Sequence, residues 1–512
     1  MLLAACSSDD SSTPGDTGGS GGSAGAPGDL GPLTRAPSTL EQTLVPKVAK
    51  LPKYDENHNP SLVENLSFYD GDPGVLEVKA GDPVVVRAID GSTPPAAGAN
   101  AKQLVRYAHL ADLQLADDES PTRVGDLDSA GETNAALRPQ DPLLCRMTNA
   151  AVRTINFEHG RKPIDFVLLG GDNSDSAQTN EVDWAITLLS GGNVECDSGA
   201  DDDPVPGPGN DGKDPFVAEG LKMPWKWVTG NHDVLVQGNF AISESQKTKV
   251  LGTDDGTGTR GYASAPYGQL VYENIVADPK RALLSRTELM SRVADAGDGH
   301  GIGGDQKTSG RAFYHFDVPD SPMRFIIMDT ATELGGSEGV LLKSHVESYV
   351  KPALEEAKTQ GKLVILASHH ASGSLTTNGG AFGTEQPGAI TADEWRDVLG
   401  GYDNVIATMV AHSHQHRVNL IKPPGGGHAY WEIMTSAIAD FPHEFRVLEV
   451  WDQDNGWLMI RATCMDLATE NDALAEEGRR RGVIDVYSGW VPDGRGADGE
   501  RNVELYIKKP GG

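Results

Sequence analysis

The sequence predicts an α/β fold whose central strands are covered on both faces. From Gln103 onward, seven short runs are almost continuously apolar, as strands buried on both faces are; they are LVRYAHLADLQ, IDFVLLGGDNSD, MPWKWVTGNHD, MRFIIMDT, KLVILASHH, NVIATMVAHSHQH and YWEIMTSAI. Segments 344–359 and 392–399 mix charged and apolar residues as surface helices do, and such segments separate several of the runs. The 512 residues suffice for one large α/β domain with additions, or for two to three ordinary domains.

Composition divides the chain into four parts. Residues 1–35 are low-complexity and predict a disordered tether. Residues 36–102 contain GVLEVKAGDPVVVRAID and predict a small N-terminal β-rich extension followed by a linker. Residues 103–450 carry the βα pattern, and residues 451–512 return to β-like runs, which predicts a C-terminal β-rich segment packed on the main domain.

Two long insertions interrupt the βα pattern. Residues 191–221 are acidic and rich in Gly and Pro, which predicts a surface loop. Residues 236–310 show little periodicity and either line a substrate site or decorate the surface. Their GDGHGIGGDQKTSG stretch lacks the GKS or GKT ending of a phosphate-binding P-loop, so we interpret it as loop.

The N-terminus bears on localisation. Leu3-Ala4-Ala5-Cys6 resembles a bacterial lipobox, in which the cysteine is lipidated, but only five residues precede Cys6 and a full apolar signal region is missing. We expect an exported, lipid-anchored protein of the cell envelope or extracellular space whose true start lies upstream. If the start is real, the expectation is a cytoplasmic protein.

Cysteine content and charge restrict the remaining possibilities. Cys145, Cys196 and Cys464 are an odd number, so one pair can bridge; Cys145 with Cys196 is one possibility that the sequence does not decide. The net charge of −31 argues against nucleic-acid binding. A small anionic substrate stays possible, because a bound metal reverses the local field. No run reaches the length of a membrane span, so membrane contact is expected only through Cys6.

Five of the seven apolar runs end in polar clusters. These are Asp112-Leu113-Gln114, Gly171-Asp172-Asn173-Ser174-Asp175, Gly230-Asn231-His232-Asp233, Ser368-His369-His370 and His412-Ser413-His414-Gln415-His416. Sites in open α/β sheets form beyond the carboxyl ends of the strands. Carboxylate, amide and imidazole ligands without thiolate suit Mn, Fe, Zn, Ni or Co. We therefore expect one metal site, and we interpret Asp329, His370, His416 and His443 as structural.

The ordered set of clusters resembles the calcineurin-like metallophosphoesterase superfamily. The family pattern is DxH, then GDxxD or GDxxN, then GNHD or GNHE, a strand-end His, and GHxH. The corresponding residues here are Asp112 and Gln114, Asp172 and Asp175, Asn231 to Asp233, His369, and His412 and His414. The resemblance spans roughly residues 103–450.

The resemblance implies a four-layer αββα sandwich that holds two divalent metal ions, such as Mn, Fe or Zn. Asp172 would bridge them, with Asp112, Gln114 and His414 completing one ion and Asn231, His369 and His412 the other. His232 would contact the substrate phosphate and protonate the leaving oxygen, while Asp233 would orient its imidazole. A metal-bridging hydroxide would attack the phosphorus of a small phosphate mono- or diester directly.

Three positions depart from the family pattern. Gln114 replaces the usual His, which favours harder ions at the first position. Ala411 replaces a Gly before His412, and Ala371 replaces a Pro that usually follows the ligand histidine, which leaves His370 as the alternative to His369. Substrate identity is expected to depend on residues 236–310 and 373–390. The alternative function is a catalytically weak or inactive binding protein of the cell envelope with the same fold.

Overall fold

The computed structural model of the chain describes residues 30–47, 74–125, 136–199, 213–261, 269–297, 299–487 and 491–511. The lipobox-like start and most of the predicted tether lie outside these residues, so the lipid anchor at Cys6 stays a prediction. Within the described part of the chain, no helix is both long enough and apolar enough to cross a membrane.

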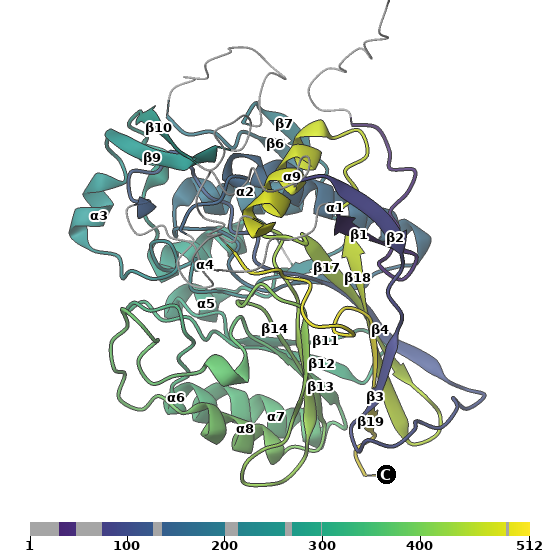
Figure 1. Ribbon diagram of the computed structural model, residues 1–512. Helices are drawn as coiled ribbons and strands as arrows, with labels where there is room; N and C mark the ends of the chain where they lie inside the picture. Colours follow the sequence, from purple (N-terminus) through teal and green to yellow (C-terminus); the bar gives the residue numbers. More distant parts are fainter. Residues whose placement is uncertain are drawn as a thin grey trace, which may run out of the picture.

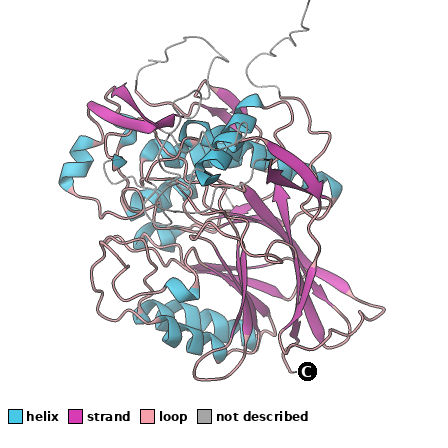
Figure 2. Ribbon diagram, in the orientation of Figure 1, coloured by secondary structure: helices cyan, strands magenta, loops and turns pink. Residues whose placement is uncertain are grey.

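Two large mixed sheets form the centre of the molecule (Figure 2). The seven-stranded sheet has the order β3 (Val85–Ala88), β19 (Val503–Lys508), β18 (Trp457–Asp466), β17 (Glu444–Asp452), β4 (Lys102–Leu110), β5 (Phe166–Leu169) and β8 (Trp225–Lys226). The six-stranded sheet has the order β11 (Tyr314–Asp317), β12 (Met323–Ile327), β13 (Leu363–Ala367), β14 (Val405–Val410), β16 (Tyr430–Met434) and β15 (Arg417–Ile421).

The seven predicted strands are present and fall into two parallel groups. β4, β5 and β8 are parallel neighbours in one sheet, and β12, β13, β14 and β16 are parallel neighbours in the other. Every residue of β5, β12, β13, β14 and β16 is buried. The continuous apolar runs are therefore explained by cover on both faces.

Helices cover the outer face of each sheet. α1 (Leu144–Arg161) and α2 (Thr179–Ser190) pack in one core cluster with residues of β4 and β5. α7 (Lys351–Thr359) and α8 (Ala392–Gly400) pack in a separate cluster with residues of β12 and β13. Figure 1 shows these two helix groups at opposite ends of the view, with α9 (Ala473–Tyr487) beside the first group.

The two sheets pack face to face through aromatic and aliphatic side chains. The ring of Phe325 on β12 lies 5.1 Å from that of Tyr107 on β4 and 5.0 Å from that of Phe166 on β5. Phe325 and Ile327 face the other sheet, whereas Ile326 between them faces the helices. The layers are thus helix, sheet, sheet and helix, which confirms the expected αββα sandwich.

The segments outside 103–450 contribute strands to the same sheet. β3 lies at its edge, parallel to β19, and β18 pairs with both β17 and β19. β1 (Gln42–Pro46) and β2 (Leu76–Ala80) form a separate antiparallel pair. The two β-like runs of GVLEVKAGDPVVVRAID are therefore strands with different partners.

The described residues of both insertions form helices and strands that their sequences do not indicate. Residues 236–310 form α3 (Glu244–Lys249), the paired strands β9 (Asp254–Gly261) and β10 (Gln269–Ile275), α4 (Arg286–Asp295) and α5 (Gly304–Ser309). The interpretation of GDGHGIGGDQKTSG as loop is wrong for its second half, which is α5. In the first insertion, β6 (Gly192–Val194) pairs with β7 (Phe216–Ala218).

The remaining helical turn, α6 (Lys343–His345), continues through a π-helical turn at Val346–Val350 into α7. The helix expected over 344–359 is therefore present. Cys145 and Cys196 are joined by a disulfide with a Cα–Cα distance of 6.5 Å, and the free thiol of Cys464 is buried.

Candidate metal centre

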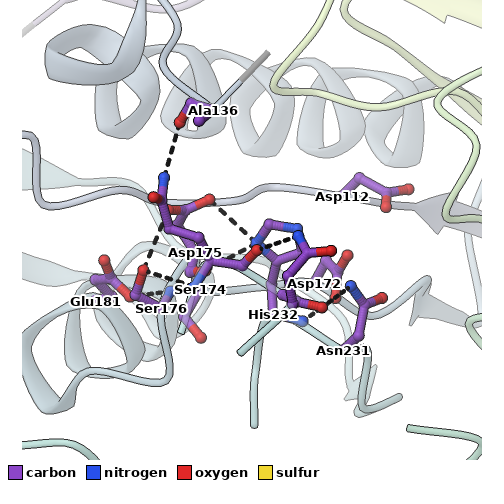
Figure 3. A network of polar contacts seen from close by, with 12 residues as sticks. Asp112, Ala136, Asp172, Ser174, Asp175, Ser176, Glu181, Asn231 and His232 are labelled. Carbon is purple, nitrogen blue, oxygen red and sulfur yellow. Dashed lines mark hydrogen bonds and ion pairs between the residues drawn. The ribbon is translucent and has the colours of Figure 1, made fainter. Parts of the chain in front are cut away.

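The predicted ligands come together where parallel strands of both sheets end. Asp112, Asp172 and Asn231 follow β4, β5 and β8, while His369 and His412 follow β13 and β14. Backbone hydrogen bonds join the loops: the Gln114 N–H donates to the Asp172 carbonyl at 2.8 Å and the Ala411 N–H donates to the His369 carbonyl at 2.8 Å. Figure 3 shows Asp112, Asp172, Asn231 and His232 in this cluster.

The cluster holds buried acceptor atoms that no hydrogen bond reaches. They are both carboxylate oxygens of Asp112, Oε1 of Gln114, Oδ2 of Asp172, Oδ1 of Asn231 and Nε2 of His369. Unsatisfied buried polar atoms are rare, because each costs about 1–3 kcal/mol. Carboxylate, amide oxygen and imidazole are also the ligand types of divalent metals. A cation would satisfy all of them, so these residues fit a metal centre.

Short distances join the ligand atoms across the two sheets. His369 Nε2 lies 3.0 Å from Asp172 Oδ2, in a geometry that makes no hydrogen bond, and 4.0 Å from Asp112 Oδ1. His414 Nε2 lies 3.4 Å from Asp112 Oδ1. The ring of His412 lies 5.1 Å from that of His369. Asp112 therefore lies close to two histidines of the opposite sheet, and Asp172 lies close to one of them.

Hydrogen bonds at the far nitrogens fix two of these imidazoles. His369 Nδ1 donates to the Gly170 carbonyl at 2.8 Å, which leaves the Nε2 lone pair free toward the carboxylates. His414 Nδ1 donates to Asp440 Oδ2 at 2.5 Å, and Arg138 Nε donates to the other oxygen of Asp440 at 2.7 Å. Such outer hydrogen bonds set the tautomer and orientation of metal-binding histidines.

Backbone conformation also marks the cluster. Five of the seven expected ligands have left-handed φ angles: Asp112 (+50°), Gln114 (+39°), Asp172 (+52°), His412 (+75°) and His414 (+54°). For residues other than glycine this conformation costs about 1–2 kcal/mol each. Such strain gathers at functional sites, where the surrounding structure holds it in place.

The carboxylates and histidines shift one another's pKa. Burial lowers the pKa of His369, but the adjacent Asp172 outweighs this effect and raises it to about 9. Burial likewise lowers the pKa of His414, whereas Asp112 and Asp440 raise it to about 10. Burial raises the pKa of Asp172, but His369 and His232 hold it well below its usual range. The buried carboxylates are therefore stabilised by nearby positive charge, which protonated histidines or bound metal ions can provide.

His232 lies at the edge of this cluster. Its backbone N–H donates to Asp172 Oδ1 at 2.8 Å, and its Nδ1 donates to the Asp175 carbonyl at 2.8 Å and lies 3.1 Å from the Asp175 carboxylate. The side chain is 15% exposed, unlike the fully buried His369. Burial lowers the pKa of His232, but Asp172 and Asp175 outweigh it, so the pKa is raised.

Asp233 has a different role from the one expected. Its oxygens accept hydrogen bonds from the backbone N–H groups of Gly230, Asn173 and Ser174 at 2.8–3.0 Å. Asp175, and not Asp233, contacts the His232 imidazole. The expectation that Asp233 orients His232 is therefore wrong, because its carboxylate is used to join the loops after β5 and β8.

Each residue interpreted as structural has a hydrogen-bond or ion-pair partner, although Nε2 of His443 is a further buried nitrogen without a hydrogen bond. His370 Nδ1 lies 2.8 Å from the Thr330 hydroxyl and its Nε2 donates to the Ser337 carbonyl, which favours His369 as the ligand. Asp329 accepts from Arg286 at 2.9 Å. His416 contacts Glu444 at 2.9 Å, and His443 Nδ1 donates to the Ile438 carbonyl at 2.8 Å.

Sequence reasoning missed Asp440 and Arg138. Asp440 lies six residues beyond β16 and outside every motif of the resemblance. The only local signal is the polar residue within the apolar stretch AIADF. Its function depends on its contact with His414, which lies 26 positions away in the chain.

No protein-family model matches the sequence, and no curated protein matches it in sequence. Several solved structures are similar, including the following three. A dimetal phosphatase from Danio rerio is 12% identical, with 72% of this chain and 100% of that chain covered and a TM-score of 0.41. A purple acid phosphatase from yellow lupin (Lupinus luteus) seeds is 13% identical, with 82% and 66% covered and a TM-score of 0.32. The anchor in the inner membrane complex of Plasmodium is 12% identical, with 75% and 96% covered and a TM-score of 0.27.

Proposed function

We propose that the protein is a dinuclear metal-dependent phosphoesterase that hydrolyses a small phosphate mono- or diester. The observation that carries this proposal is the set of buried acceptor atoms without hydrogen bonds on Asp112, Gln114, Asp172, Asn231 and His369. An inactive relative that had lost metal binding would be expected to fill such a cluster with hydrogen-bond donors.

Asp172 is the residue best placed to serve two ions at once. Its Oδ2 lies beside His369 of one ligand group. The loop after its strand is bonded to Gln114 of the other group. We assign Asp112, Gln114 and His414 to one ion and Asn231, His369 and His412 to the second. When bound, two divalent ions would supply charge neutralisation at the phosphoryl group and a water of lowered pKa.

His232 is assigned the proton transfer. Asp175 holds Nδ1, so the proton that accompanies the leaving oxygen is held at Nε2. The partial exposure of this ring supports access by substrate. General acid catalysis of this kind contributes about 10²–10⁴-fold to the rate. Since no nucleophilic side chain is needed, the proposal is direct hydrolysis without a covalent enzyme intermediate.

The test is hydrolysis of p-nitrophenyl phosphate against bis(p-nitrophenyl) phosphate. The protein is expressed from Ser7 onward and reconstituted with Mn²⁺, and His232→Ala is the matched variant. Turnover that collapses in the variant while bound metal is retained supports the proposal, and the ratio of the two esters separates monoesterase from diesterase. A protein that binds no metal and hydrolyses neither ester would overturn it.

A further inference from the structure

An exposed and strained aromatic residue lies in one of the segments expected to select the substrate. Phe382 is 67% exposed, the largest value for any large apolar side chain within the described residues. Its backbone has φ = +64°, a conformation that bulky residues rarely adopt. Exposure and strain both oppose folding stability, and their coincidence at one residue points to a binding role.

Phe382 is paired with a second aromatic ring from a different loop. The rings of Phe240 and Phe382 have centroids 5.0 Å apart and planes inclined at 49°. Phe240 belongs to residues 236–310 and Phe382 to residues 373–390, the two segments that the sequence indicates as substrate determinants. The two inclined rings together present apolar surface, of which Phe382 is the exposed part.

The loop that carries Phe240 is attached to the candidate metal centre. The Gly238 carbonyl accepts a hydrogen bond from Asn231 Nδ2 at 2.9 Å. Gly238 lies against the imidazole of His232 so closely that a Cβ atom there would be 2.3 Å from Nε2. Phe240 is two residues further on, and two residues span at most about 7 Å. Phe240 therefore lies within about 7 Å of Gly238, the residue that contacts His232. A small organic group can bridge such a distance.

The segment 335–337 joins the second loop to the same centre. The Gly336 N–H donates to the Asn239 carbonyl at 2.8 Å, and Gly335 packs against the carbonyl of Phe382. The Ser337 carbonyl accepts from His370 Nε2 at 2.9 Å, and the His370 ring lies 4.7 Å from that of His412. The loop of Phe240 therefore contacts His232 directly, whereas the loop of Phe382 is linked to His412 through residues 335–337 and the structural His370.

The charge of these loops restricts what the pair can bind. Residues 236–242, 332–342 and 371–391 contain no Lys or Arg, and they include the carboxylates of Glu333, Glu338 and Glu385. The arginines packed against these segments already have partners on them, because Arg286 and Arg311 pair with Glu333 and Arg396 donates to Ser372. A second phosphate or another anionic group would therefore be poorly bound there. An uncharged flat ring would stack on the phenyl surfaces.

We propose that Phe240 and Phe382 form a subsite for an aromatic ring carried by the phosphoester substrate, a proposal that rests on the proposed phosphoesterase function. The phosphoryl group lies at the metal centre beside His232, and the uncharged organic part of the ester extends along residues 238–240 to the aromatic pair. The ring is either a nucleobase or a simple aryl group.

The experiment compares esters that differ in the ring but not in the reactivity of the leaving oxygen. One pair is adenosine 5′-monophosphate and ribose 5-phosphate, and the other is 2-phenylethyl phosphate and ethyl phosphate. The methyl diester of each compound is assayed beside it, so that a diesterase is covered. The wild type, Phe382→Ala, Phe382→Tyr and Phe240→Ala are compared with Val78→Ala, an exposed apolar control on β2.

The wild type is expected to prefer the ring-bearing member of a pair, chiefly through a lower KM. Phe382→Ala and Phe240→Ala should reduce that preference about tenfold or more, as removal of one stacking partner does. Metal content should stay at the wild-type value in both variants. Phe382→Tyr should keep the preference of the wild type, and Val78→Ala should not alter it. The pair of esters that shows the preference tells whether the subsite binds a nucleobase or a simple aryl group.

Two results separate failure of the subsite from failure of the proposed function. If the p-nitrophenyl esters are hydrolysed and neither matched pair shows a ring preference, or the preference survives both alanine variants, the subsite is overturned alone. If the metal-loaded protein hydrolyses no ester of any kind, the phosphoesterase proposal fails and the subsite fails with it.

Discussion

Among the described residues, two fully buried clusters of metal-ligand type do not share a residue, and they differ in their hydrogen bonding. Asp112, Asp172 and His369 form one, while His416, Glu444 and Cys464 form the other; in each, the ligand atoms lie within 4.8 Å of one another. In the first cluster, buried oxygens and an imidazole nitrogen lack hydrogen bonds. The second cluster is surrounded by partners that satisfy it.

The partners of the second cluster come from several elements. Arg501 forms an ion pair with Glu444, and His416 lies 2.9 Å from the Glu444 carboxylate and 3.0 Å from the Ser436 hydroxyl. Burial raises the pKa of Cys464 to about 12, so its sulfur stays a thiol that donates to the Arg501 carbonyl. A thiol is a poor metal ligand. Hydrogen-bond satisfaction, rather than residue type, therefore separates a candidate metal centre from a structural network.

The largest expected effect is loss of the metal centre through Asp172→Asn. The neutral amide removes the carboxylate that we assign to both ions, so metal content measured by mass spectrometry should fall from two ions per chain to less than one. Activity should fall by more than about 10⁴-fold, because metal ions contribute several kcal/mol to transition-state stabilisation. The matched variant in the second cluster is Glu444→Gln, which should retain both ions. Equal metal loss in the two variants would remove the distinction between the clusters.

Substitution of His232 tests catalysis apart from metal binding. His232→Ala should reduce kcat by about 10²–10⁴-fold, because the proton donor to the leaving oxygen is lost. Metal content should stay at the wild-type value, since His232 is not assigned as a ligand. His315→Ala is the control, because that partly exposed ring contacts Tyr349 and Glu356 and none of the assigned ligands. A variant with unchanged kcat would assign proton transfer to another group.

Asp440→Asn should weaken metal binding by a smaller amount. Asp440 fixes the tautomer of His414 and receives Arg138 on its other oxygen. Loss of such an outer carboxylate costs about 10–100-fold in metal affinity. Competition with a chelator measures this directly. Asp329→Asn is matched, because Asp329 is also buried and paired with an arginine but contacts none of the assigned ligands. Equal affinities in both variants would show Asp440 to be structural.

The strands and the candidate ligands could be predicted from the sequence, whereas the contacts that surround them could not. The seven apolar runs are strands with both faces covered, and such strands can be recognised from their own continuously apolar composition. The position of β3 beside β19 is not local, since it joins residues more than four hundred positions apart. The roles of Asp175 and Asp440 likewise depend on which side chain reaches which imidazole. The periodicity of the sequence carries no information on such contacts. For Asp233, the motif alone led to the wrong prediction that it contacts the His232 imidazole.

The smallest effect on the metal centre is expected from Glu444→Gln, whose effect on stability should be large. Arg501 would keep only its ion pair with the partly exposed Asp82, at 2.6 Å, and would lose the fully buried one. Loss of a hydrogen bond between charged groups costs about 1.5–3 kcal/mol in the free energy of unfolding. Denaturant unfolding measures this value. The control is Glu347→Gln, which removes an exposed ion pair with Lys351 and should cost less than about 1 kcal/mol.

The pH dependence of unfolding provides an independent measurement of the same ion pair. Burial raises the pKa of Glu444, but Arg501 and His416 outweigh it and lower the pKa to about 2, below the ordinary value of 4.5. Since the folded state lowers this pKa, the stabilisation is complete above the ordinary value and is lost as the pH falls toward 2. The wild type should therefore lose stability between about pH 5 and pH 2, and Glu444→Gln should lose less over the same range. Parallel curves for the two proteins would mean that Glu444 is not ionised in the folded state, and the second cluster would then hold no ion pair.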